Sequence, residues 1–261
     1  MRAFKLVFVV IHILLGLLLL ILTGALWNPH SKRVKTTKRW WLSRIVRILG
    51  IEVEVYGELP SKKNQEGLMF VSNHVSWIDI PLIGGIQETC FLSKAEVRDW
   101  PLIGKLAEGT GTLFIKRGSG DAKRVTGLIA ERANEGHSVL FFPEGTTTDG
   151  SSVKTFHRKL FKAGEQTQAY FCPVVISYEV EGEAINPVAF IDDDEFTEHL
   201  WHLLSFPHIK ARVEFLPMRR IDQGNLTKEV QELEQLMRTK VEARNRRINL
   251  GESEAAPVVP V

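Results

Sequence analysis

A histidine and an aspartate, His74 and Asp79, lie five positions apart in the otherwise apolar stretch FVSNHVSWIDIPL. On a regular helix, positions five apart are separated by about 140° around the axis, so these two side chains would not meet there. They can meet at a turn between a strand and a helix, and Pro81 places such a helix start close to Ser76 or Asp79. In such a turn the carboxylate would accept a hydrogen bond from one imidazole nitrogen. The other nitrogen would be free to act as a base toward a hydroxyl group.

A structural interpretation of the same stretch stays open. Ser76 followed by Asp79 matches a capping box, in which Asp79 satisfies backbone N–H groups of the first helical turn. His74 would then be a loop histidine without a chemical role. From this stretch alone the structural interpretation is the better one, because short motifs often occur by chance.

A second polar cluster follows the apolar run at 138–142. In FPEGTTTDG, Glu144 stands directly after that run, and Gly145 permits close approach of the backbone to a ligand. Three hydroxyl groups come next, on Thr146, Thr147 and Thr148. The alternative is a polar loop in which these threonines and Asp149 only cap the backbone.

A third cluster is basic. GTLFIKRGSGD delivers Lys116 and Arg117 to the end of another apolar run, ahead of a glycine-rich turn and a helix that would start at Asp121. This arrangement suits a phosphate or carboxylate group. Taken alone, a solvated basic edge explains it better.

Beyond residue 50, short apolar runs alternate with helical segments, and these elements must hold the three clusters. The expected strands are 51–57, 67–72, 89–93, 111–117, 137–143, 171–179 and 211–217. The expected helices are 76–86, 119–135, 154–165, 194–204 and 226–248. The alternation predicts an α/β fold, with a mostly parallel central sheet flanked by helices in one domain at 51–250 and a disordered tail at 251–261. Because ligands gather outside the carboxyl ends of parallel strands, the three clusters are expected to form one site.

The first fifty residues predict a membrane-anchoring helical segment. Residues 6–27 carry no charged side chain, and at about 1.5 Å per residue they could cross a bilayer core of about 30 Å. A cleaved signal peptide is the main alternative, but its apolar region would be shorter. Residues 31–50 then combine seven cations with Trp40 and Trp41 and no acid, which is typical of a basic amphipathic helix at a membrane interface. Whether 6–27 spans the bilayer or dips into it stays open.

More cations follow the apolar segment than precede it. This asymmetry predicts that the globular part lies on the cytoplasmic side of the inner membrane. The overall balance of 33 basic and 31 acidic residues gives no indication of nucleic-acid binding. Cys90 and Cys172 are too few for a disulfide framework or a zinc ribbon. His199 and His202 share a helix face, but no carboxylate or cysteine is placed to complete a metal site with them.

Taken together, the clusters resemble the lysophospholipid and glycerophosphate acyltransferase family. The resemblance rests on NHVSWID, GTLFIKR, FPEGTTTDG and CPVVIS in that order, and it covers about residues 50–220. It implies transfer of a fatty acyl group from a thioester of coenzyme A or acyl carrier protein to a hydroxyl of a lyso-lipid. It implies no metal, no cofactor and no covalent intermediate.

The same resemblance implies roles for individual residues. His74 would be the general base and Asp79 would orient it. Arg117 would contact the acceptor headgroup, with Glu144 and Gly145 near the acceptor. The implied substrate-binding residues are Lys116, Arg117, Glu144, Gly145, Thr146 and Thr147.

One position departs from the family pattern. The third motif commonly reads Phe-Pro-Glu-Gly-Thr-Arg, and Thr147 stands where that arginine would be. A guanidinium is a bidentate phosphate ligand, so its loss puts a phosphomonoester acceptor in question. The variant resembles the branch that includes lyso-ornithine-lipid acyltransferases. We expect acylation of 1-acyl-glycerol-3-phosphate to phosphatidic acid, with lyso-ornithine lipid or another lysophospholipid as the alternative acceptor.

Two other function classes stay open. The chain could be a non-catalytic membrane lipid-binding protein, or a hydrolase that uses the His74 and Asp79 pair on water. An intact pair together with Glu144 favours catalysis, and a site that excludes water would favour transfer over hydrolysis. The expected partners are membrane lipids, an acyl thioester donor and a lyso-lipid acceptor.

Overall fold

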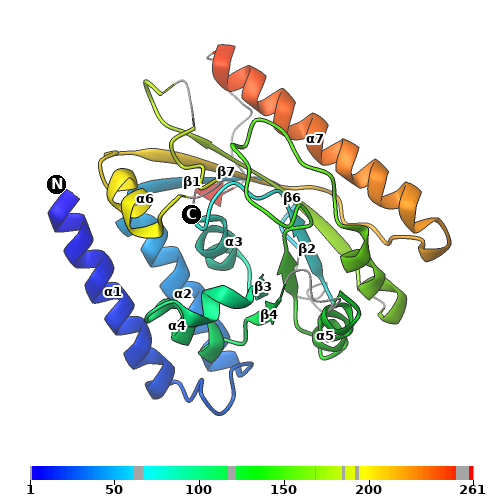
Figure 1. Cartoon of the computed structure of the whole chain (residues 1–261), viewed down its shortest axis with the longest axis horizontal. Coiled ribbons are helices and arrows are strands. Elements are labelled where there is room, and N and C mark those ends of the chain that lie inside the picture. Colours follow the sequence, from blue (N-terminus) through cyan, green and yellow to red (C-terminus); the bar gives the residue numbers. More distant parts are fainter. Residues whose placement is uncertain are drawn as a thin grey trace.

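The computed structural model describes residues 2–60, 67–116, 122–167, 169–183, 186–191, 194–250 and 259–260. Within them, the strands form one eight-stranded sheet in the order β4-β3-β5-β2-β6-β7-β1-β8 (Figure 1). The strands are β1 (Ile51–Gly57), β2 (Met69–Ser72), β3 (Cys90–Lys94), β4 (Leu113–Ile115), β5 (Val139–Phe141), β6 (Phe171–Glu179), β7 (Ile209–Phe215) and β8 (Val259–Pro260). The pairs β6–β7 and β1–β8 are antiparallel and the other neighbours are parallel. The expected α/β class with a mostly parallel sheet is confirmed.

The helices lie on both faces of this sheet. They are α1 (Arg2–Leu22), α2 (Lys32–Ile48), α3 (Asp79–Ile86), α4 (Ile103–Gly109), α5 (Ala122–Asn134), α6 (Phe196–Leu203) and α7 (Leu226–Leu250). Among the described residues, 3₁₀ helices accompany them at η2 (Ala95–Asp99), η3 (Arg158–Gln166) and η4 (Gln223–Asn225). Because successive strand residues point to opposite faces, Phe70 joins the core under α2, α3 and α6, whereas Met69 and Val71 join the core under α5, η3 and α7.

Two segments differ from the sequence prediction. The helix expected at 154–165 is wrong in its first turn, because the backbone N–H groups of Lys154 and Phe156 donate to the carboxylates of Glu144 and Glu234. The chain is therefore non-helical there and enters η3 only at Arg158. Helix α4 was not predicted, because seven residues are too few to show a helical period.

The amino-terminal helices pack on the domain and on each other (Figure 1). The His12 ring stacks on Trp41 with centroids 4.8 Å apart. The two residues also exchange hydrogen bonds of 2.9 Å between ring nitrogens and backbone carbonyls. Helix α2 buries Val34, Leu42 and Ile45, so its apolar face contributes to the protein core. Its cations are exposed at positions 32, 33, 39, 44 and 47, whereas Lys38 turns toward the interior.

The outer face of α1 is apolar and exposed. Its exposed side chains are Phe4, Val7, Phe8, Val10, Ile11, Leu14, Leu18, Ile21 and Leu22. By length and composition α1 could cross a membrane, and this face supports membrane association. At the other end of the chain, most of the expected disordered tail lies outside the described residues. The backbone of Val259 and Pro260 pairs with β1, and the expectation for the remaining residues stays a prediction.

Candidate active site

His74 lies in the turn between β2 and α3, and the turn is anchored to strand β6. The Asn73 side-chain amide donates to the Ile176 carbonyl at 3.0 Å, and the Asn73 amide oxygen accepts from the Ile176 N–H at 2.8 Å. Both residues are buried. The residue before His74 is therefore fixed to the neighbouring parallel strand, which sets the direction of the turn.

His74 and Asp79 meet in this turn. His74 Nδ1 lies 2.7 Å from Asp79 Oδ2, so Nδ1 carries the proton and donates to the carboxylate. The same oxygen accepts the backbone N–H groups of Val75 at 2.7 Å and Ser76 at 3.0 Å. One carboxylate thus makes the contacts that both the capping and the base-orienting interpretations require. The Ser76 hydroxyl has no hydrogen-bond partner within the described part of the chain, so a complete capping box does not form.

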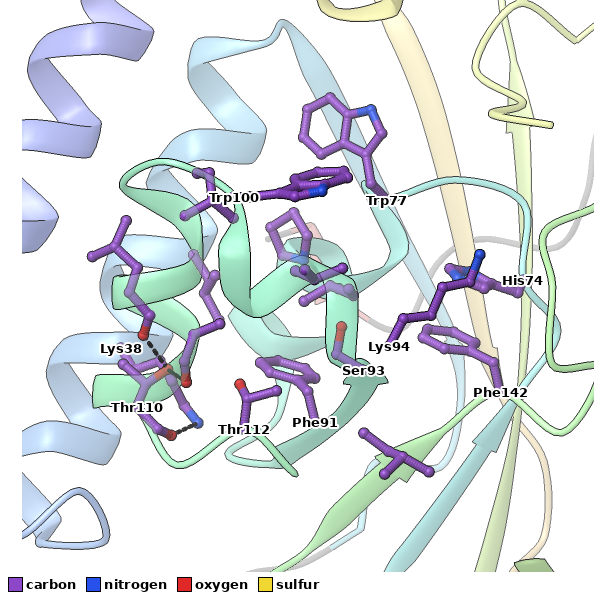
Figure 2. A pocket seen from close by; sticks show the side chains of 18 of the residues that line it. Lys38, His74, Trp77, Phe91, Ser93, Lys94, Trp100, Thr110, Thr112 and Phe142 are labelled. Atoms are coloured by element: carbon purple, nitrogen blue, oxygen red, sulfur yellow. Dashed lines mark hydrogen bonds between the residues drawn. The ribbon is translucent and has the colours of Figure 1, made fainter. Parts of the chain in front are cut away.

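The second ring nitrogen of His74 is directed away from this network. Its ring stacks on Phe142 with centroids 3.8 Å apart and planes 8° apart, as the close-up shows (Figure 2). Among the described residues none hydrogen-bonds to Nε2, and the side chain is 17% exposed at the wall of a cavity. Nε2 is consequently available as a proton acceptor inside the cavity.

Glu144, in the loop that follows β5, holds the backbone of this turn in place. Its Oε1 accepts the His74 N–H at 2.8 Å and its Oε2 accepts the Lys154 N–H at 2.7 Å. Thr148 adds a third contact, donating its N–H to the His74 carbonyl at 2.8 Å. Burial raises the pKa of Glu144 to about 7, with a smaller contribution from the charge of Asp79, although the two backbone N–H groups oppose the rise. Glu144 thus binds backbone N–H groups of the turn and of the loop that follows β5, in addition to lining the cavity.

Gly145 needs its glycine for two reasons. Its φ of +69° is strained for any residue with a side chain, and a Cβ there would lie 2.7 Å from Cδ2 of His157. The imidazole of His157 therefore lies over the backbone at Gly145. His157 itself is exposed and lines the cavity.

The other predicted substrate-binding residues fall on the same cavity where they are described. Lys116, Thr146 and Thr147 line it together with His74 and Glu144. Arg117 lies outside the described residues, so its expected role stays a prediction. The three polar clusters thus converge as the sheet topology predicts, apart from this one residue.

The cavity has a volume of about 1150 Å³ and extends from His74 to the amino-terminal helices. Its apolar wall includes Ile13, Leu20, Leu42, Trp77, Phe91 and Leu106. In Figure 2, Trp77 and Trp100 lie along one side of it, and Lys38 and Thr110 lie at a distance from His74. Lys38 Nζ donates to the carbonyls of Thr89 at 2.8 Å and Thr110 at 3.3 Å. A long apolar chain with its reactive carbonyl at His74 matches this shape.

The histidines of α6 have structural contacts. His199 accepts a hydrogen bond from Trp77 Nε1 at Nδ1, and its Nε2 lies 2.9 Å from the Ala189 carbonyl. Burial lowers the pKa of His199, in keeping with a neutral ring between these partners. In the described part of the chain, no group of three or more His, Cys, Asp or Glu side chains is placed to hold a metal ion.

Several residues of the site were not found from the sequence. Phe142 stacks on His74, Asn73 anchors its turn, and Tyr178 donates its hydroxyl to Asp79 Oδ1 at 2.6 Å. Phe142 and Asn73 are the first residues of the motifs FPEGTTTDG and NHVSWID, but nothing in their types points to these contacts. Tyr178 is 99 positions from Asp79, and only the strand order brings the two together.

Comparison with known proteins agrees with this geometry. A family model described as Acyltransferase matches residues 52–177. A lyso-ornithine lipid O-acyltransferase of Pseudomonas aeruginosa is 42% identical over 214 residues, covering 81% of this chain and 80% of its own. A 1-acyl-sn-glycerol-3-phosphate acyltransferase of Neisseria meningitidis is 30% identical over 173 residues, covering 66% and 67%. The crystal structure of the 1-acyl-sn-glycerophosphate acyltransferase of Thermotoga maritima shares the fold, with a TM-score of 0.66, 19% identity and coverage of 93% and 96%. The chain belongs to the acyltransferase family and is an acyltransferase enzyme.

Proposed function

We propose that this enzyme is a lysolipid O-acyltransferase whose preferred acceptor is lyso-ornithine lipid. Two relatives named for that acceptor are more similar to this chain than the Neisseria enzyme is: besides the Pseudomonas protein, a lyso-ornithine lipid O-acyltransferase of Rhodobacter capsulatus is 40% identical over 165 residues, against 30% for the Neisseria enzyme. Thr147, in place of a phosphate-binding arginine, supports the same choice. Our expectation from sequence put 1-acyl-glycerol-3-phosphate first, and the comparisons support the alternative better.

In the proposed mechanism, His74 acts as the general base. Nε2 takes the proton of the acceptor hydroxyl while the hydroxyl oxygen attacks the carbonyl carbon of the acyl thioester. The tetrahedral intermediate then expels the thiolate by cleavage of the C–S bond, and the imidazolium returns the proton to sulfur. Asp79 stabilises the imidazolium between these two transfers. No acyl-enzyme forms, because the donor is already activated as a thioester.

One observation carries this proposal above the others. The only side-chain partner that the described residues provide for the His74 ring nitrogens is the buried Asp79 carboxylate, and Nε2 faces a cavity of about 1150 Å³ with a largely apolar wall. A lipid-binding scaffold needs the cavity but gains nothing from a buried imidazole–carboxylate pair, whose burial costs free energy. A hydrolase would need water at Nε2, whereas this cavity suits an acyl chain and a lipid hydroxyl.

We further propose that the enzyme rests on the cytoplasmic face of the inner membrane. The exposed apolar face of α1 would contact lipid, and the cations of α2, among them Arg39, Arg44 and Arg47, would meet anionic headgroups. The contacts of His12 with Trp41 hold α1 against the domain. This favours an α1 that lies in one leaflet beside the cavity over one that leaves the domain to span the bilayer.

The acyl donor is proposed to be a thioester of coenzyme A or acyl carrier protein. Both carriers are polyanionic, and the cavity wall includes the exposed basic side chains of Arg158 and Lys159 beside His157. These residues would attract either donor. A second acceptor, lysophosphatidate, is favoured by the same basic wall and by the Neisseria relative.

The proposal is tested with the full-length protein in detergent and a radiolabelled acyl thioester. Lyso-ornithine lipid and lysophosphatidate are offered separately and then in competition. Product that favours lyso-ornithine lipid by kcat/KM is expected. A preference for lysophosphatidate would overturn the proposed acceptor, release of free fatty acid alone would indicate a hydrolase, and no turnover of either acceptor would favour the scaffold.

A further inference from the structure

The two carboxylate oxygens of Asp79 accept hydrogen bonds from different parts of the protein. Oδ2 accepts from His74 and from two backbone N–H groups, so its hydrogen-bonding capacity is used within the turn. Oδ1 accepts the hydroxyl of Tyr178 at 2.6 Å, and no other donor to Oδ1 is seen among the described residues. Asp79 is fully buried and Tyr178 is 5% exposed, so water cannot readily replace this donor.

Tyr178 lies on β6, two residues after the residue that anchors Asn73. Strand β6 therefore holds the turn of His74 on both sides, through Asn73 before the histidine and through Asp79 after it. The two strands are neighbours in the sheet, since β2 and β6 pair in parallel register. A hydroxyl group on a central strand fixes the plane of the Asp79 carboxylate more precisely than a hydroxyl group on a loop would.

Tyr178 can act only as the donor in this contact. Burial and the neighbouring charge of Asp79 raise the pKa of Tyr178 well above its ordinary value of 10. The phenol is therefore protonated at every pH at which the enzyme would work. Its proton lies toward Oδ1 and withdraws negative charge from the carboxylate that faces His74.

We propose that Tyr178 is a positioning residue for acyl transfer. Its hydroxyl orients the Asp79 carboxylate toward His74 and reduces the negative charge on that carboxylate. This inference rests on the proposed role of the His74 and Asp79 pair. Loss of the hydroxyl would let the carboxylate rotate and would lower kcat. It would also concentrate charge on Oδ2, so that the imidazolium of His74 is stabilised and the acid limb of the pH–rate profile moves to higher pH.

The test is Tyr178→Phe, which keeps the ring and removes the hydroxyl. The expected result is a fall in kcat of about tenfold, the rate equivalent of one lost hydrogen bond to a charged group, with KM nearly unchanged. The acid limb of the pH–rate profile should move to higher pH by about half a unit. A merely structural role would lower the amount of folded enzyme without moving that limb. Glu144, whose pKa responds to the charge of Asp79, and Lys94, Lys116 and His157, which line the cavity with His74, are present in both proteins and contribute to both profiles alike.

Tyr56→Phe is the matched control, because it also removes a tyrosine hydroxyl that donates to a carboxylate, that of Glu54 at 2.8 Å. Tyr56 does not line the cavity, so its variant should keep the wild-type kcat and pH profile. In an Asp79→Asn background, Tyr178→Phe should cost little further rate, because the tyrosine acts through Asp79.

An unchanged kcat and acid limb in Tyr178→Phe, or a rate loss fully additive with Asp79→Asn, would overturn this inference. Activity in His74→Ala would instead overturn the proposed mechanism. The two failures are therefore distinguishable.

Discussion

The Glu144 carboxylate accepts the backbone N–H of His74 at 2.8 Å, and so joins the loop after β5 to the turn after β2 across 70 positions of sequence. The contact makes Glu144 a support for the proposed base as well as a wall of the cavity. It also places a carboxyl with a raised pKa beside the buried Asp79. The position of the His74 backbone therefore depends on the same carboxyl group whose protonation sets the charge next to Asp79.

Glu144→Gln should show this coupling as a difference in pH-dependent stability. A carboxyl whose folded pKa is raised from 4.5 to about 7 binds a proton more tightly in the folded state. The wild type should therefore lose free energy of unfolding as pH rises from about 4.5 to about 7. With about 1.4 kcal/mol per pKa unit, the loss is up to about 3 kcal/mol.

The glutamine variant cannot ionise and should not show that loss. Urea unfolding of both proteins between pH 4.5 and 8 measures the difference. Parallel stability curves would contradict the raised pKa. In the same variant kcat should fall, because glutamine replaces one of the two acceptor oxygens and leaves one N–H group poorly paired.

Gly145→Ala should destabilise the protein more than the replacement of a positive-φ glycine whose added Cβ would meet open space. It combines a strained positive φ, worth about 1 kcal/mol, with a Cβ only 2.7 Å from His157. Gly182→Ala is the matched control, because Gly182 has a φ of +83° and no atom within 4 Å of the added Cβ. Thermal unfolding should give the lower Tm for Gly145→Ala. In a His157→Ala background the two variants should converge, and a persistent gap would show that the imidazole is not the obstacle.

Thr147→Arg should shift acceptor preference toward lysophosphatidate. The guanidinium would add a bidentate phosphate ligand at the cavity wall, and we expect kcat/KM for lysophosphatidate to rise about tenfold relative to lyso-ornithine lipid. Thr147→Met, with a long side chain but no charge, controls for size. Equal preferences in the arginine and methionine variants would mean that residue 147 does not read the headgroup.

Ala107→Phe should shorten the preferred acyl chain. Ala107 lies on α4 and lines the cavity near Thr110, so a phenyl ring there would occupy volume that a long chain needs. Activity with a series of thioesters of increasing chain length measures the shift. Ala243→Phe, on α7 and outside the cavity, should leave the preference unchanged. An unaltered preference in Ala107→Phe would mean that the acyl chain lies elsewhere.

The sequence predicts the parts of this site that depend on local order. Strand ends carry the polar clusters, and Pro81 and Asp79 place the start of α3, so the meeting of His74 with Asp79 follows from one turn. The contacts of Tyr178 and Asn73 depend on which strands are neighbours, and no local pattern reveals that. The role of α1 and α2 as cavity walls is hidden for the same reason, since their apolar residues are equally suited to lipid and to a protein interior.

The most direct test of the central claim is the rate of acyl transfer by His74→Ala, measured beside His208→Ala. His208 forms a comparable pair with Glu52, at 2.9 Å, but lies exposed outside the cavity. Both variants should sediment with membrane vesicles like the wild type. His208→Ala should keep full activity. The rate of acyl transfer by His74→Ala should be lower by about 10²–10⁴-fold, the contribution of a general base. Wild-type rates in His74→Ala would contradict the account.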